Sequence, residues 1–162
     1  DLTKESIFNI INHSNKFSID IKKANVLDLF SGVGSFGIEC LSQGASHVTF
    51  IEKYEGVLPI LKKNLNNLKS EINYEIIESD ILNNFKFKNL KSRYDIIFLD
   101  PPYKEQALEN ILNTIIENKV LKNNGIIIIH RHKKEADKFP KKFHLIDEKS
   151  YGISKIIFGS YF

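Results

Sequence analysis

Residues 25–37 read NVLDLFSGVGSFG, an apolar run that carries an acid at Asp28 and is followed by a turn rich in glycine. The apolar run predicts a buried strand, and the glycines predict a tight turn that leads into a helix. A G-x-G-x-x-G turn between a strand and a helix is typical of α/β folds that bind nucleotides. This stretch therefore predicts an α/β fold with a ligand close to the backbone of the glycine turn.

The rest of the chain alternates between strands and helices in the same way. Further buried strands are predicted over residues 47–52, 74–78, 94–100 and 125–130. Helices are predicted over residues 5–11, 54–68 and 105–119, and one more runs from the glycine turn to near Gly44. Such alternation indicates βαβ units, with a parallel sheet covered by helices on both faces.

The C-terminal part breaks this alternation. Residues 143–148 and 153–162 predict two strands joined by a turn at 150–152, so one strand of the hairpin must run antiparallel. Residues 83–93 are polar and irregular and predict a surface loop. We therefore expect a single Rossmann-like domain over residues 1–162, with a mostly parallel seven-stranded sheet and a C-terminal antiparallel hairpin.

Composition narrows the class of protein. Apolar content of 42% and charged content of 27% are ordinary for a soluble globular domain, and no apolar run could cross a membrane. Cys40 has no second cysteine to pair with, which favours a reducing cytoplasm, and its position predicts a small buried helix residue. A net charge of +3 permits a nucleic-acid partner without requiring one. Since the chain begins at Asp1 and has no methionine, we expect a segment ahead of Asp1 that is missing here.

The strand predicted over 94–100 ends in an unusual turn, Asp100-Pro101-Pro102-Tyr103. The prolines fix φ and remove two backbone donors, so the turn is stiff and its carbonyls are free. A carboxylate, a free carbonyl and a flat ring then lie side by side. This combination suits the binding of an amino group on a planar ring, and it predicts chemistry on a nucleobase.

The glycine turn leaves two ligand classes open. Glu52 follows Gly32 by 20 residues and could accept hydrogen bonds from both hydroxyls of a ribose, as in sites for NAD or for S-adenosylmethionine. Asp28 favours the second, because a carboxylate repels a pyrophosphate and attracts ammonium and sulfonium groups. Asp80 follows the third strand, where it could bind an adenine amino group or simply cap a turn.

Taken together, these motifs resemble a known family. The stretch from Asp28 to Glu39, followed by Asp100 to Tyr103, resembles the class I S-adenosylmethionine-dependent methyltransferases that methylate amino groups. The opening residues 1–9 and the closing residues 148–158 extend the resemblance to the bacterial 16S ribosomal RNA guanine-N2 methyltransferases, the RsmD family. The Asp-Pro-Pro-Tyr motif by itself is shared with adenine-N6 enzymes.

This resemblance implies a function and a site. The chain would methylate the N2 amine of a guanine in 16S ribosomal RNA, within a 30S subunit or assembly particle, as a cytoplasmic monomer. S-adenosylmethionine would bind to a set of residues at the first three strand ends: Asp28, Phe30, Gly32, Gly34, Glu52, Lys53, Asp80 and Ile81. The target base would be held and methylated at Asp100, Pro101, Pro102 and Tyr103.

Alternatives remain on the sequence alone. An adenine-N6 or other amino methyltransferase would use the same motifs, whereas an NAD-dependent oxidoreductase would use the glycine turn and leave the proline turn unexplained. The basic run of residues 130–134 could bind RNA phosphates or form a solvated loop with equal ease. His13, His47 and His144 lack the spacing of metal ligands, so no metal is expected.

Overall fold

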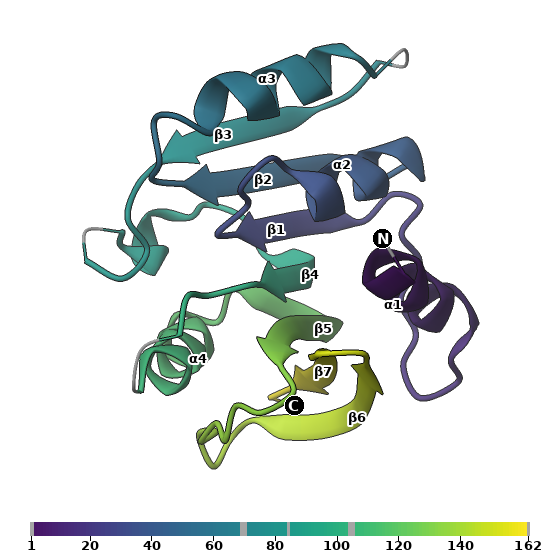
Figure 1. Ribbon diagram of the computed structural model, residues 1–162, viewed down its shortest axis with the longest axis vertical. Coiled ribbons are helices and arrows are strands. Elements are labelled where there is room, and N and C mark those ends of the chain that lie inside the picture. Colours follow the sequence, from purple (N-terminus) through teal and green to yellow (C-terminus); the bar gives the residue numbers. More distant parts are fainter. Residues whose placement is uncertain (1, 69–70, 84, 104–105, 162) are drawn as a thin grey trace.

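The computed structural model describes residues 2–68, 71–83, 85–103 and 106–161. A seven-stranded sheet runs through it in the order β3-β2-β1-β4-β5-β7-β6 (Figure 1). The strands are β1 (Asn25–Leu29), β2 (His47–Glu52), β3 (Tyr74–Glu78), β4 (Tyr94–Leu99), β5 (Leu121–His132), β6 (His144–Tyr151) and β7 (Ser154–Ser160). Strands β1 to β5 pair in parallel, and β7 pairs antiparallel with both β5 and β6. The mostly parallel sheet with an antiparallel C-terminal hairpin is confirmed.

Helices cover both faces of the sheet (Figure 1). Alternate residues of β4 show how: Ile96 and Phe98 pack on one face, and Ile97 and Leu99 on the other. The first face is covered by α1 (Leu2–His13), α2 (Ser35–Ser42) and α3 (Leu58–Asn66), and the second by α4 (Ala107–Asn118). Burial on both faces explains why the central strands are continuous apolar runs.

Helix α1 docks on the sheet through a stack of aromatic rings. The ring of Phe8 lies 5.2 Å from that of Phe36 in α2, and Phe36 lies 4.2 Å from Phe98 in β4, centroid to centroid. All three side chains are buried. The N-terminal helix is therefore joined to the centre of the sheet rather than lying at its edge.

The strand order places a topological switch between β1 and β4. From β1 the chain moves outward through β2 and β3, then crosses back to form β4 on the other side of β1. In open α/β sheets, ligands bind in the crevice at the carboxyl ends of strands flanking such a point. Phe30 follows β1 and Asp100 follows β4, so the two predicted motifs meet there.

Several predicted bounds were wrong. Helix α3 begins at Leu58 rather than Tyr54, because residues 55–57 form a turn ahead of Pro59. Strand β5 begins at Leu121 and ends at His132, beyond the predicted 125–130, since it follows β4 and then β7 along their lengths. The predicted start of α4 at Glu105 lies outside the described residues, as do Asp1 and Phe162.

Two predictions of irregular chain also need correction. The hairpin turn lies at Gly152 and Ile153, because Ser150 and Tyr151 still pair with β7. The predicted surface loop at 83–93 contains a 3₁₀ turn, η1 (Phe87–Asn89), and Phe87 is buried under α4. Within the described residues, no helix combines the length and apolar character needed to cross a membrane.

Candidate active site

Two adjoining cavities open at the carboxyl ends of the central strands. The first, the β2–β3 cavity, has a volume of about 370 Å³ and is lined mainly by residues that follow β1 to β4, among them Phe30, Gly32, Glu52, Lys53, Asp80, Ile81, Asp100, Pro101 and Pro102. The second, the β1–α1 cavity, has a volume of about 480 Å³ and lies between the glycine turn and α1, with Asp28 and Lys4 in its walls. Both volumes are typical of small-molecule sites. Phe30, Gly32 and Asp100 line both cavities.

Glu52 joins the end of β2 to the glycine turn. Its carboxylate accepts hydrogen bonds from the backbone N–H groups of Gly32, Lys53 and Tyr54 at 2.9, 2.9 and 3.0 Å. The side chain is buried yet borders the β2–β3 cavity. A carboxylate offers about four acceptor positions, so three amide bonds fix its orientation and leave room for a ligand hydroxyl.

The first two glycines of the turn, Gly32 and Gly34, have different structural roles. A methyl group added at Gly32, where φ is +55°, would meet no atom within 4 Å, so this position faces open space in both cavities. A methyl group at Gly34, where φ is +88°, would overlap Leu61 of α3. Gly34 lines neither cavity. The structure thus places Gly34 in packing between the turn and α3, apart from the ligand cavities for which the sequence selected it.

Phe30 adopts a backbone conformation that is rare for a bulky residue. Its φ is +59°, in the left-handed region that costs an L-residue about 1–2 kcal/mol. This conformation ends β1 sharply and places Phe30 at the border between the two cavities. Strain of this kind gathers at ligand-binding sites, where the surrounding fold maintains it.

Asp28 is an acid inside the sheet. Its side chain is 1% exposed, and its carboxylate accepts a hydrogen bond from the Gly37 N–H at 3.1 Å. Burial raises the pKa of Asp28 well above its usual range, the Gly37 bond opposes this, and the nearby Asp100 and Glu52 carboxylates add to the rise. A cation in the adjoining β1–α1 cavity would relieve this cost. Asp28 can therefore both accept the Gly37 N–H and face a cation in this cavity.

Asp80 lies at the far end of the β2–β3 cavity, after β3. One carboxylate oxygen accepts a hydrogen bond from the Leu82 N–H at 3.0 Å, and the other accepts one from the Asn83 amide at 2.7 Å. Lys53 forms an ion pair with it at 3.7 Å. Asp80 thus caps the turn after β3, and its neighbour Ile81 presents an apolar wall to the same cavity.

The Asp100-Pro101-Pro102-Tyr103 turn forms the border between the β2–β3 cavity and a third one. This β5–β7 cavity is lined by Asp100, Pro101, Tyr103 and by residues of β5 and β7, including His130 and Ser154. The Asp100 side chain is 51% exposed, and the Tyr103 ring, at 68%, is among the most exposed aromatic groups described. Proline φ angles keep the turn stiff, so the acid and the ring present a fixed surface.

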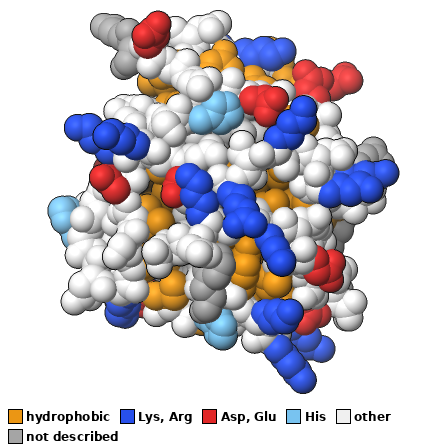
Figure 2. All heavy atoms as spheres, turned by 180° about the vertical axis from the view of Figure 1, so that it is seen from behind, with side chains coloured by type: hydrophobic (Ala, Val, Ile, Leu, Met, Phe, Trp, Pro, Cys, Tyr) orange, Lys and Arg blue, Asp and Glu red, His pale blue; other side chains and the backbone are white. Residues whose placement is uncertain are grey.

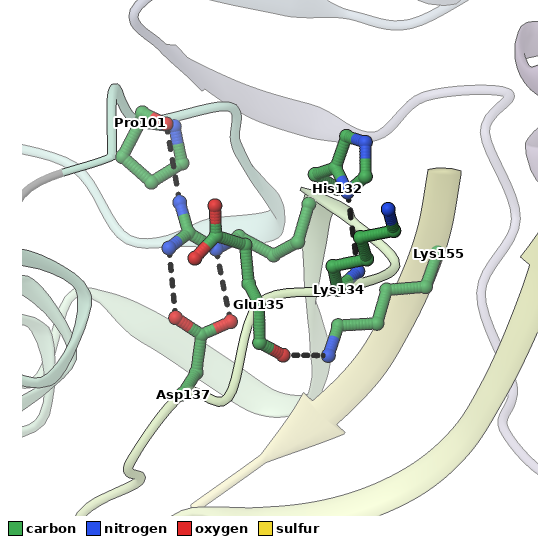
Figure 3. Close-up of polar contacts among 7 residues, drawn as sticks. Pro101, His132, Lys134, Glu135, Asp137 and Lys155 are labelled. Atoms are coloured by element: carbon green, nitrogen blue, oxygen red, sulfur yellow. Dashed lines mark hydrogen bonds and ion pairs between the residues drawn. The ribbon is translucent and has the colours of Figure 1, made fainter. Parts of the chain in front are cut away.

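A side chain that the sequence did not single out holds this turn in place. Arg131 donates from Nη1 to the Pro101 carbonyl oxygen at 3.2 Å and pairs with Asp137 through two hydrogen bonds, at 2.9 and 2.7 Å (Figure 3). Its guanidinium carbon also lies 5.9 Å from the centroid of the Tyr103 ring. The Pro101 carbonyl, expected to be free, already has one donor.

The basic run at 130–134 therefore does not act as one unit. Arg131 is buried and paired, His130 is half-buried beside Asp100, and only His132, Lys133 and Lys134 are exposed. The segment that follows is tied down as well, since Lys155 of β7 donates to the Glu135 carbonyl oxygen (Figure 3). Strand alternation in β5, which points adjacent side chains to opposite faces, is the sequence feature that could have separated these residues.

Other predicted features are also placed by the structure. Cys40 is fully buried in α2, as expected, and burial raises the pKa of its thiol. Across the described residues, no three His, Cys, Asp or Glu side chains are grouped closely enough to hold a metal ion.

The residues of the first two cavities suit the cofactor predicted from the sequence. The open space at Gly32 lets a ligand approach the backbone, and the β2–β3 cavity combines the Glu52 and Asp80 carboxylates with an apolar wall at Ile81. The hydroxyl groups of a ribose and the amino group of a flat heterocycle match that set of acceptors. The β1–α1 cavity offers the buried Asp28 to a positively charged group.

Comparison with known proteins gives a consistent result. The family model described as Conserved hypothetical protein 95 matches residues 1–160. Ribosomal RNA small subunit methyltransferase D of Haemophilus influenzae is 35% identical over 154 residues, which cover 94% of this chain and 77% of that protein. The protein of the same name from Buchnera aphidicola subsp. Acyrthosiphon pisum is 36% identical over 129 residues, covering 80% of this chain and 66% of that protein. A solved structure from Haemophilus influenzae has a TM-score of 0.78 and 33% identity, covering 99% of this chain and 97% of that one.

Proposed function

The chain belongs to the family of ribosomal RNA small subunit methyltransferase D, and on this premise we propose that it transfers a methyl group from S-adenosylmethionine to the N2 amine of a guanine in 16S ribosomal RNA. The observation that carries the proposal is the position of Asp100. This residue borders both the β2–β3 cavity, which suits the cofactor, and the β5–β7 cavity beside the exposed Tyr103 ring. A group that orients an amine toward a methyl donor must lie between the two.

Five of the predicted cofactor residues have a defined part in this proposal. Glu52 accepts a hydrogen bond from one ribose hydroxyl at the acceptor position that its three amide bonds leave open, and Ile81 packs against the adenine ring. Lys53 and Asp80 close the adenine end, and Asp28 faces the positively charged methionine end. When bound, S-adenosylmethionine supplies an electrophilic methyl group next to Asp100.

The turn after β4 then acts on the target base. Asp100 accepts one N–H of the exocyclic amine, and the second lone pair of the Pro101 carbonyl, left open by Arg131, accepts the other. This arrangement turns the nitrogen lone pair toward the methyl group, and such alignment provides much of the acceleration. The nitrogen–carbon bond forms as the carbon–sulfur bond breaks, and the surplus proton leaves the amine through Asp100 to water.

Tyr103 holds the base in this orientation. Its ring is exposed and sits beside the Arg131 guanidinium, so one of its faces is open to a nucleobase. Stacking of a base on an aromatic side chain is worth about 1–3 kcal/mol. That contribution offsets part of the cost of removing the guanine from its stack in the RNA.

We further propose that the substrate is an assembled 30S particle or an assembly intermediate, bound by a monomer. The net charge is only +3, and Figure 2 shows a face on which basic side chains are interspersed with acidic and hydrophobic ones. Such a surface binds RNA phosphates weakly by itself. A prefolded particle would supply the remaining recognition through its shape.

The test is transfer of a labelled methyl group from S-adenosylmethionine to unmethylated 30S particles, protein-free 16S ribosomal RNA and DNA, followed by nucleoside analysis. We expect N2-methylguanosine, with the particles as the preferred substrate. Formation of N6-methyladenosine would show that the target base is adenine and not guanine. Equal transfer to free RNA would refute the preference for assembled particles. Calorimetric binding of NAD in the absence of S-adenosylmethionine binding would overturn the proposal as a whole.

A further inference from the structure

His130 lies in β5, two residues before its C-terminal end, and both ring nitrogens have a polar neighbour. Nδ1 is 3.3 Å from Oδ2 of Asp100, which follows β4, and Nε2 is 3.0 Å from Oγ of Ser154, the first residue of β7. The ring is 29% exposed and borders both the β1–α1 and the β5–β7 cavities. Three neighbouring strands thus contribute one residue each to a chain of contacts that ends on Asp100.

This contact matters because little else restrains the carboxylate of Asp100. Among the described residues, His130 is the one side chain with a polar atom recorded within ion-pair distance of it, at 3.3 Å. The carboxylate is also half-exposed, so without a partner it could rotate between its side-chain rotamers. Glu52, by contrast, is fixed by three amide bonds.

We propose that His130 is a positioning residue for methyl transfer, an inference that rests on the proposed function. His130 holds Oδ2 of Asp100, so the other oxygen, Oδ1, is the one presented to the amine of the target base. Ser154 holds the far side of the ring and sets the angle at which the imidazole meets Asp100. His130 acts on the amine through Asp100.

The geometry separates this role from binding of the adenosine part of the cofactor. His130 does not line the β2–β3 cavity, where Glu52, Asp80 and Ile81 lie. His130 borders the β1–α1 cavity, but the β2–β3 cavity is unchanged by its loss, so removal of the ring should lower turnover far more than binding of S-adenosylmethionine. Misorientation of a catalytic group by about 1 Å lowers rates by about 100-fold, so the loss expected in kcat is of the order of 10- to 100-fold.

The experiment compares the variants His130→Ala, His130→Asn and Ser154→Ala with the unmodified chain. Asparagine can place its amide nitrogen close to the position of Nδ1 and so keep a donor for Asp100. We expect His130→Ala to lower kcat by about 10- to 100-fold, and His130→Asn to recover most of that loss. The loss in Ser154→Ala should be smaller, and the KM for RNA and the Kd for S-adenosylmethionine should stay within about twofold in all three. His144→Ala is the matched control, because His144 is exposed at the start of β6 and lines none of the three cavities.

The outcomes separate this inference from the proposed function. If the unmodified chain transfers no methyl group to any RNA, the proposed function fails. If it does so and His130→Ala retains the same kcat, or if His130→Asn falls as far as His130→Ala, the positioning role is wrong. If circular dichroism shows that His130→Ala does not fold, His130→Asn and Ser154→Ala are compared with the unmodified chain instead. An unchanged kcat in Ser154→Ala then overturns the inference.

Discussion

The two sides of the candidate site are held in place by different parts of the chain. At the ends of β1 and β2, the carboxylates of Asp28 and Glu52 are fixed by backbone N–H groups. The turn after β4 is held instead by side chains of β5, with Arg131 on the Pro101 carbonyl and His130 on Asp100. The cofactor side thus depends on local chain geometry, whereas the base side depends on the correct packing of neighbouring strands.

The support of the base side can be broken most severely at Asp137. Removing one partner of a buried ion pair costs about 3–5 kcal/mol, so Asp137→Ala should lower the free energy of unfolding by that amount. Both side chains of the Arg131–Asp137 pair are almost fully buried. Urea denaturation measures the change. Glu78→Ala, which removes an exposed pair with Lys62, is the control and should cost less than about 1 kcal/mol.

A loss below about 1 kcal/mol in Asp137→Ala would show that the turn after β4 does not depend on this pair. The double variant Arg131→Leu with Asp137→Leu should recover much of the stability, because no charge is left buried without a partner. It should not recover methyl transfer, since the Pro101 carbonyl has lost its donor.

Asp100 separates the two sides by function. Asp100→Ala should lower methyl transfer at least about 100-fold, which corresponds to about 2.7 kcal/mol in the barrier. Binding of S-adenosylmethionine, measured by calorimetry, should change less than about tenfold, since Glu52 and its amide bonds are untouched. Surviving activity would remove the carboxylate from the proposed mechanism.

Glu52 tests the cofactor side alone. Glu52→Gln keeps one acceptor oxygen but replaces the other with a donor that cannot satisfy backbone N–H groups. We expect S-adenosylmethionine to bind about tenfold more weakly, or about 1.4 kcal/mol, while kcat at saturating cofactor is retained. The matched control is Glu78→Gln, at the end of the next strand, where the side chain is exposed. Equal affinity in the two variants would contradict the role given to Glu52.

The smallest expected effect is the contribution of Asp28 to the pH dependence of the free energy of unfolding. Burial raises the pKa of this carboxyl in the folded state, so the folded chain binds the proton more tightly than the unfolded chain does. Stability should therefore fall as the pH rises from the ordinary carboxyl range through the raised pKa. Asp28→Asn should abolish this fall and be no less stable at neutral pH, because its amide oxygen still accepts the Gly37 N–H bond. Urea unfolding over a pH series checks this, and a parallel fall in both proteins would exclude Asp28 as the cause.

The same contrast explains what could be predicted from the sequence. The glycine turn, Asp28 and Glu52 are local features whose residue types and spacing imply a backbone geometry, and the structure brings all of them except Gly34 and Gly37 to the cavities. The alternation of strands and helices predicted the sheet because each central strand is buried on both faces. Phe87, missed in a predicted loop, could have been suspected from the alternating aromatic residues at 85 and 87.

The supports of the base side could not be predicted in this way. Arg131 bonds to a carbonyl 30 residues away, and Ser154 meets His130 from 24 residues away. Both contacts depend on which strands lie next to each other and on which face each side chain points to. Periodicity predicts elements but not their lateral order, so the basic run of residues 130–134 was interpreted as one cluster.

The aromatic stack that joins α1 to the sheet has a consequence for the energetics of binding. Thr3, Lys4 and Ile7 of α1 line the cavity next to Asp28, and Phe8 anchors the helix through Phe36 to Phe98. A ligand in that cavity would favour the docked helix over its detached form, by the mass-action linkage that applies to any ligand of the native state. Slower amide hydrogen exchange in α1 would then report that the cofactor is bound. A substitution that weakens the packing of Phe8 would lower the affinity for the cofactor, although Phe8 lies outside the cavity.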